Sequence, residues 1–159
     1  MILINRHGWK MSEQQTIHAT LVALQNKGVL LKGKSSSGKS DLALRLIQNK
    51  KATLVADDIV IITKESTSVT GRAPQNLQGL LEVRGIGIVR LPFLAEISID
   101  LIVNLQDNEK SVERMPKDAY ENIFGVEIKQ IDLYAKENSA PEKIQIKLFG
   151  TLISDKPLS

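Results

Sequence analysis

The sequence predicts a single α/β domain with a mixed β-sheet core and few helices. Residues 28–62 run through a strand, a glycine-serine loop, a helix and a second strand, an order typical of α/β folds. The second half of the chain consists mostly of short apolar runs separated by Gly, Pro and charged turns, which indicates further strands. A chain of 159 residues with 42% hydrophobic residues is long enough to close around one core. We therefore expect a short N-terminal lead over residues 1–15 and one domain over residues 16–159.

Each strand is predicted from a short run of apolar residues bounded by turn residues. The runs on either side of the glycine-serine loop and its helix predict strands at residues 17–24, 28–32, 52–56 and 59–62. Further strands are expected at residues 68–70, 80–83, 86–91, 97–105 and 126–134. The polar stretch at residues 106–117 is expected to form an exposed loop.

Three helices are predicted from apolar residues that recur at helical spacing. The first begins at Ser40, directly after the loop, and ends near Lys50. A second, shorter helix is expected over residues 117–123. The third begins at Pro141 and carries apolar residues at spacings of four. These residues are Ile144, Leu148 and Leu152.

The composition excludes several classes of function. The chain has no cysteine, so it can form neither disulfides nor cysteine-based metal sites. Its net charge of +3 is spread along the sequence and its aromatic content is 4%, so we expect no nucleic-acid binding. The apolar residues 1–4 are followed at once by polar ones, which predicts no membrane segment. A cytoplasmic protein is the expectation that fits these features.

The glycine-serine loop matches the phosphate-binding pattern G-x-x-x-x-G-K-[ST] at every fixed position. It follows a predicted strand and opens a predicted helix, so its glycines can turn backbone N–H groups toward a phosphate at the helix N-terminus. Lys39 is expected to reach the β- and γ-phosphates, and Ser40 is expected to ligate Mg²⁺. The full candidate phosphate loop is Gly33-Lys34-Ser35-Ser36-Ser37-Gly38-Lys39-Ser40.

Two further segments carry side chains suited to phosphate chemistry. Asp57 and Asp58 follow a predicted strand, where one carboxylate can serve Mg²⁺ and the other a proton, although a plain acidic turn is the alternative. His18 precedes the loop and could orient the aspartate, or simply be a packed or surface histidine. Glu82 and Arg84 are expected on one face of a strand, where a surface ion pair is the alternative to function.

Taken in order, these segments resemble HPr kinase/phosphorylase from about residue 16 to about residue 135. The most specific of them looks like that family's signature. It reads Leu81-Glu82-Val83-Arg84-Gly85-Ile86-Gly87-Ile88. The other three are the histidine segment around His18, the phosphate loop, and the strand end that carries Asp57 and Asp58.

The resemblance implies a nucleotide-binding core similar to phosphoenolpyruvate carboxykinase, in a protein that assembles as a hexamer. It also implies phosphorylation of a serine of the phosphocarrier HPr with ATP or pyrophosphate, and the reverse phosphorolysis. By the same resemblance, Ser40 and Glu82 match the Mg²⁺ ligands. The chain looks like the short proteobacterial forms, which lack an N-terminal domain. Residues 139–143 depart from the family's partner-contact segment, so HPr recognition or the reverse reaction is expected to differ.

The remaining catalytic roles also come from the resemblance. Lys39 matches the phosphate-loop lysine and Asp57 matches the base that exchanges a proton with the serine. His18 matches the histidine of the site. Arg114 resembles a later active-site arginine, which would stabilise charge on the transferring phosphoryl group. The loop and the acidic pair alone would equally suit a kinase for a small molecule, or a nucleotide-sensing module without catalysis.

Overall fold

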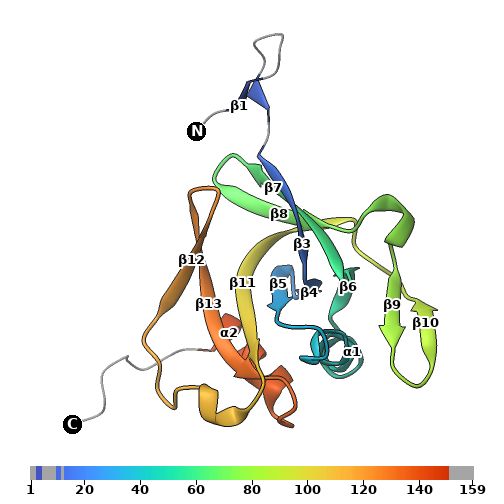
Figure 1. Ribbon diagram of the computed structural model, residues 1–159, viewed down its shortest axis with the longest axis vertical. Helices are drawn as coiled ribbons and strands as arrows, with labels where there is room; N and C mark the ends of the chain where they lie inside the picture. The colour runs from blue at the N-terminus through green and yellow to red at the C-terminus, as the bar shows by residue number, and fades with distance from the viewer. Residues whose placement is uncertain (1–2, 5–9, 12, 151–159) are drawn as a thin grey trace.

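The computed structural model describes residues 3–4, 10–11 and 13–150. The first strands are β1 (Leu3–Ile4), β2 (Lys10–Met11), β3 (Gln14–His18), β4 (Thr20–Leu24) and β5 (Lys27–Lys32). Helix α1 (Lys39–Lys50) is followed by β6 (Thr53–Ala56), β7 (Ile59–Glu65), β8 (Ser68–Arg72), β9 (Leu80–Val83) and β10 (Gly87–Arg90). The chain continues through β11 (Glu96–Gln106), β12 (Ala119–Ile123), β13 (Val126–Tyr134) and α2 (Ala140–Phe149), as shown in Figure 1. No helix in these described ranges is both long and apolar enough to cross a membrane.

The predicted mixed sheet is present, and its topology gathers several strand ends at one edge. The strands lie in the order β3-β7-β8-β11-β5-β4-β6, with β13 also paired to β11 and β12 paired to β13. Strands β5, β11 and β13 are parallel, whereas β4 is antiparallel to both β5 and β6. The carboxyl ends of β5 and β6 therefore point the same way, and each of them leads into a segment with a predicted functional residue.

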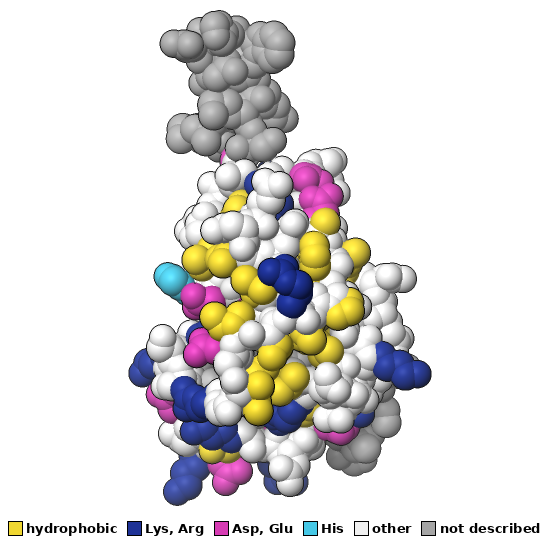
Figure 2. Space-filling model, turned by 90° about the vertical axis from the view of Figure 1, so that its right-hand side faces the viewer, with side chains coloured by type: hydrophobic (Ala, Val, Ile, Leu, Met, Phe, Trp, Pro, Cys, Tyr) yellow, Lys and Arg dark blue, Asp and Glu magenta, His cyan; other side chains and the backbone are white. Residues whose placement is uncertain are grey.

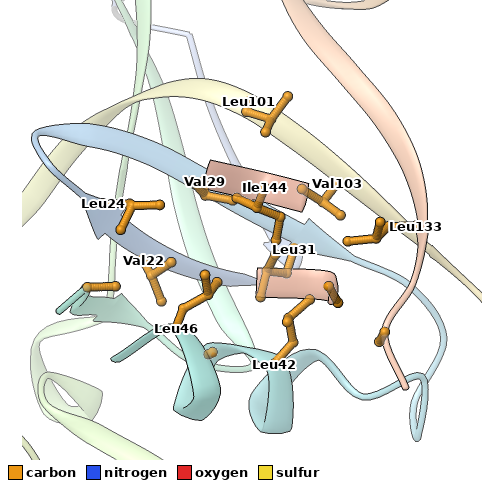
Figure 3. Packing of buried hydrophobic residues seen from close by; sticks show 14 of the residues in the cluster. Val22, Leu24, Val29, Leu31, Leu42, Leu46, Leu101, Val103, Leu133 and Ile144 are labelled. Atoms are coloured by element: carbon orange, nitrogen blue, oxygen red, sulfur yellow. The ribbon is translucent and has the colours of Figure 1, made fainter. Parts of the chain in front are cut away.

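The core lies on both faces of this sheet. On one face, α1 and α2 cover β4, β5, β11 and β13, and Figure 3 shows the apolar side chains that fill this space. On the other face, β7 and β8, which belong to the other end of the same sheet, pack against these strands. All five residues of β4 are consequently buried, as is usual for a strand covered on both sides.

The helix after the loop begins as predicted, and the backbone conformation of the residue before it explains where it starts. Gly38 precedes it with φ of 97°, a left-handed conformation that favours glycine, and Lys51 ends it with φ of 59°. Its apolar face buries Leu42, Ala43 and Leu46 against the sheet. The third predicted helix is also present as α2, with Pro141 in its first turn; Leu152, the last residue expected in it, lies outside the described residues.

Two predictions about local structure are wrong. Residues 117–123 do not form a helix, because β12 pairs with β13 through a two-residue turn in which Phe124 and Gly125 both have positive φ. Residues 17–24 do not form one strand, because β3 pairs with β7 whereas β4 pairs with β5 and β6. The chain passes from one to the other at Ala19, whose N–H donates to the carbonyl of Asp58.

Candidate active site

The phosphate loop, residues 33–40, is a tight turn between β5 and α1. A Cβ on Gly33 would lie 2.5 Å from the Ser37 hydroxyl oxygen, so only glycine fits the curled loop there. Ser36 and Gly38 both have positive φ, and the Ser37 N–H donates to the Lys34 carbonyl at 3.0 Å. The first N–H groups of α1, which an α-helix leaves without partners inside the helix, lie at the end of this turn. This arrangement can hold an anion at the helix N-terminus.

Lys39 is folded across the loop that carries it. Its ammonium group donates to the Gly33 carbonyl at 2.7 Å and to the Lys34 carbonyl at 2.9 Å. An ammonium group has three protons, so one remains for a phosphate oxygen. Residues 33–36 are exposed, whereas Ser37 is buried, so the outer part of the loop is open to a ligand.

Asp57 is joined to the phosphate loop by a direct hydrogen bond. The Ser40 hydroxyl donates to Asp57 Oδ1 at 2.7 Å, and the Thr20 hydroxyl donates to the same oxygen at 2.9 Å. The second oxygen, Oδ2, accepts a long bond of 3.3 Å from the Glu82 backbone N–H. The predicted strand end, the loop and the Glu82 segment therefore meet at one carboxylate.

His18 and Asp58 form a separate pair at the surface. His18 Nδ1 lies 3.8 Å from Asp58 Oδ1, and the two side chains are 83% and 74% exposed. Asp57 is only half-exposed and faces the loop, so the neighbouring carboxylates point to different surroundings. The orienting contact to Asp57 that was expected from His18 comes in the structure from Thr20.

Glu82 lies in the hairpin formed by β9 and β10, one residue before the end of β9. Strands β9 and β10 pair antiparallel, with Ile88 opposite Glu82, and the turn between them holds Arg84. Arg84 is therefore in a turn rather than on the strand face shared with Glu82, and both side chains are exposed. Near the tip, Ile86 is 77% exposed and Ile88 is 73% exposed. Figure 2 shows the face of the molecule on this side, over which apolar side chains gather.

Arg114 lies in the segment between β11 and β12. Its side chain is exposed, and none of the hydrogen bonds or ion pairs found among the described residues joins it to the phosphate loop. A cavity of about 550 Å³ lies below this segment, lined by its residues together with parts of β13 and α2. The segment starts beside the loop, where Lys34 forms an exposed ion pair with Asp107 at 3.3 Å.

Two contributors to the site were missed by the sequence prediction. Thr20 was not singled out as a site residue, and the Glu82 backbone N–H carries no side-chain signal at all. A threonine within the strongly apolar run of β4 is an indication that could have been used, because a buried hydroxyl needs a partner.

The oxygen donors near the loop suit a magnesium ion. Ser40 supplies a hydroxyl and Glu82 an exposed carboxylate, and Mg²⁺ prefers such oxygen ligands. In the part of the chain that the structure describes, no cluster of three or more His, Asp or Glu side chains could hold a metal alone. A sparse donor set is what Mg²⁺ uses when it binds with substrate phosphates and water, so Ser40 and Glu82 fit such an ion.

Curated relatives match most of this chain. It is 34% identical over 137 residues to the HPr kinase/phosphorylase of Latilactobacillus sakei, which covers 80% of this chain and 44% of that protein. It is 37% identical over 142 residues to the HPr kinase/phosphorylase of Caldanaerobacter subterraneus, which covers 82% of this chain and 46% of that protein. The chain thus spans less than half the length of these relatives.

A solved structure and a family model agree with these relatives. The structure of the Hpr(Ser) kinase/phosphatase from Coxiella burnetii superposes with a TM-score of 0.74 at 26% identity, over 84% of this chain and 93% of that one. The fold is therefore the α/β fold of that protein, with a mixed sheet and few helices. The model of the HPr Serine kinase C-terminal domain matches residues 9–144. The chain belongs to the family of the HPr serine kinase C-terminal domain.

Proposed function

We propose that this chain is a Mg²⁺-dependent serine kinase and phosphorylase for HPr or an HPr-like carrier protein. The observation that carries the proposal is the 2.7 Å hydrogen bond from Ser40 to Asp57, which joins a candidate base to the candidate phosphate site. The relatives named above, which are called HPr kinase/phosphorylase, support the choice of reaction and substrate.

The phosphate loop would hold the donor, which we propose to be ATP or pyrophosphate. The backbone N–H groups at the start of α1 and the Lys39 ammonium would contact the β- and γ-phosphates. Lys39 already points along the loop, so its remaining proton is available without a new backbone conformation. A bound Mg²⁺, held by Ser40 and Glu82, would neutralise charge on these phosphates.

Asp57 would act as the base in the kinase direction. The carrier's serine hydroxyl gives its proton to Asp57 while its oxygen forms a bond to the γ-phosphorus, and the bond from that phosphorus to the leaving phosphate oxygen breaks. Oδ1 already accepts two hydroxyl protons, whereas among the described residues Oδ2 accepts only the long bond from Glu82 N–H. Oδ2 is therefore the oxygen with acceptor capacity left for the serine proton.

Phosphorolysis would run through the same groups in reverse. An oxygen of inorganic phosphate attacks the phosphorus of the phosphoserine, the bond from phosphorus to the serine oxygen breaks, and pyrophosphate forms. The protonated Asp57 then returns its proton to the serine oxygen, as microscopic reversibility requires. His18 and Arg114 would act beside this centre, Arg114 by stabilising charge on the transferring group.

The surface beside the site favours a protein substrate over a small molecule. The β9–β10 hairpin, which carries Glu82, presents Ile86 and Ile88 largely exposed, and exposed apolar groups next to a site are suited to a protein partner. A kinase for a small metabolite needs no such surface. Ile86→Asp with Ile88→Asp should therefore weaken transfer to the carrier while leaving ATP binding unchanged.

Three properties accompany the proposed function. We propose that residues 16–159 form the catalytic unit, that it works in the cytoplasm, and that it assembles as a homo-oligomer, a hexamer by the family resemblance. Light scattering on the purified protein would test the assembly, with a monomer at working concentration as the contradicting result.

Labelled ATP tests the proposed reaction directly. The protein is incubated with Mg²⁺, labelled ATP and each HPr-like carrier of its own organism, together with a carrier whose target serine is replaced by alanine. Label on the serine-containing carrier alone is the expected result. Asp57→Asn should lower transfer about 10²- to 10⁴-fold while nucleotide binding persists. Glu65→Gln, which alters an exposed carboxylate at the end of β7, serves as the control. Absence of label on every carrier would contradict the proposal.

A further inference from the structure

Thr20 is a buried polar residue in an otherwise apolar strand. It has no solvent exposure, and the four residues after it in β4 are buried and apolar. A buried hydroxyl is costly unless it makes a hydrogen bond, so a valine of nearly the same shape would suit the packing better. The hydroxyl of Thr20 donates to Asp57 Oδ1 at 2.9 Å, and this hydrogen bond offsets the cost of burying it.

An irregularity in strand pairing brings Thr20 to this position. Val22 pairs with Leu54, but Leu21 pairs with Ala56, so Val55 is the extra residue on β6. With regular pairing, Leu21 would face Val55 and Thr20 would face Ala56. The shift moves the pairing of the two strands by one residue, and beyond the last pair, Leu21 with Ala56, the next residues are Thr20 and Asp57, whose side chains are hydrogen-bonded. Bulges beside active sites commonly redirect a side chain in this way.

The two hydroxyl donors on Oδ1 come from parts of the protein that differ in rigidity. Ser40 belongs to the phosphate loop and to the proposed magnesium site, so its surroundings change when a ligand binds. Thr20 is the first residue of β4 and is fully buried, so the packing around it should hold it in place whether or not a ligand is bound. The bond from Thr20 therefore holds Oδ1, while Oδ2 lies on the side of the exposed Glu82, whose backbone N–H it accepts.

We propose that Thr20 is a positioning residue for Asp57 and that its hydroxyl fixes the carboxylate for proton exchange with the substrate serine. The reaction that this residue would assist is taken from the proposed function. The choice of Thr20 itself rests on its hydrogen bond to Asp57 and on its buried position in β4. Thr20 acts through Asp57 and does not contact the substrate.

Three variants test this role by kinetics. Thr20→Val keeps the shape and removes the hydroxyl, and kcat for transfer to the carrier should fall about 10- to 100-fold, with KM for ATP unchanged. Thr20→Ser restores the hydroxyl and should recover most of kcat. Thr70→Val is the matched control, because Thr70 is also a buried threonine with a hydroxyl hydrogen bond but lies in β8; its kcat should equal that of the unchanged protein.

A double variant separates positioning from general damage. If Thr20 acts through Asp57, Thr20→Val should cause no further loss of residual transfer in the Asp57→Asn background. An additional loss of the same size would overturn the inference, as would a Thr20→Val enzyme with normal kcat. Equal losses in Thr20→Val and Thr20→Ser would also overturn it, because the hydroxyl would then be irrelevant.

A crystal structure of Thr20→Val keeps the inference testable if the proposed function fails. The Asp57 carboxylate should leave its position against Ser40 or take a second conformer in this variant. An Asp57 side chain unchanged from the wild-type crystal structure would refute the positioning role, whatever the activity. Absence of transfer by the wild-type protein would refute the proposed function and leave the structural comparison as the deciding result for Thr20.

Discussion

Gly33→Ala is expected to distort the phosphate loop through a direct collision. The added Cβ would lie 2.5 Å from the Ser37 hydroxyl oxygen, 3.0 Å from Ser37 Cβ and 3.2 Å from Leu105 Cβ. Ordinary contact begins at 3.4 Å, so the hydroxyl would have to retreat by about 0.9 Å, the difference between 3.4 and 2.5 Å. Rotation of Ser37 does not solve the problem, because its Cβ is also too close and the residue is buried.

The size of the effect follows from the cost of overpacking a tight site. Inserting a methyl group where the surroundings cannot yield costs about 1–3 kcal/mol. If the loop backbone shifts to relieve the collision in the free protein, it must return to the cradle shape when a phosphate binds. The same energy then weakens binding, and about 1–3 kcal/mol corresponds to roughly a 5- to 150-fold rise in the Kd for Mg·ATP or pyrophosphate.

Calorimetric titration with Mg·ATP and with pyrophosphate measures this loss, and urea unfolding measures stability in parallel. Gly125→Ala is the control, because it also replaces a glycine by alanine, but in the β12–β13 turn, where the nearest atom would be 3.8 Å away and the strain comes instead from a positive φ of 83°. It should lower stability without changing the Kd. Adding Ser37→Ala to Gly33→Ala removes the worst contact and should recover part of the affinity.

The reasoning about the loop would be refuted by a Gly33→Ala protein that binds both ligands and unfolds as the unchanged protein does. It would also be refuted if the Gly125→Ala control lost the same affinity, because the loss would then reflect general instability. A double variant with Ser37→Ala that binds no better than Gly33→Ala would show that the collision is not with the Ser37 hydroxyl.

Two further predictions concern the contacts that hold α1 and α2 in place. Arg45 donates from its guanidinium to the carbonyls of Ala135 and Glu137 after β13, so Arg45→Lys should lower the free energy of unfolding by about 1–3 kcal/mol in urea titration, although the charge is kept. The pKa of Glu142 is lowered from its usual value of 4.5, first by the hydrogen bond from its own backbone N–H and then by Lys50 at 3.3 Å. Because the pKa of Glu142 is lower in the folded than in the unfolded protein, its carboxylate stabilises the fold above about pH 4.5, and this stabilisation is lost as pH falls through the pKa of the folded state. Glu142→Gln should therefore have a smaller free energy of unfolding than the unchanged protein at neutral pH, and the difference between the two should shrink as pH falls below about 4.5. A difference that does not change with pH would contradict this account.

The parts of the fold that were predicted well are those in which local sequence and tertiary structure agree. The loop between β5 and α1 was found from its motif, because the turn and the helix start are set by residues that are contiguous in the chain. The hairpin of β12 and β13 was missed because its turn, Phe124-Gly125, lacks the usual Asn-Gly or Asp-Gly pair. There, pairing with a neighbouring strand overrode a weak helical pattern.

The candidate site was predicted in part for the same physical reason. Lys39, Ser40 and Asp57 occur in short motifs, and the structure brings the last two into direct contact. The place of Thr20 relative to Asp57 depends instead on the register between β4 and β6, which shifts by one residue at Val55. A shift of one residue leaves the apolar pattern of β4 almost unchanged, because this strand is buried on both faces and the pattern does not specify its register. The contact between Thr20 and Asp57 therefore had to be found from strand pairing, and a buried threonine in an apolar strand is the sequence signal that should prompt the search for its partner.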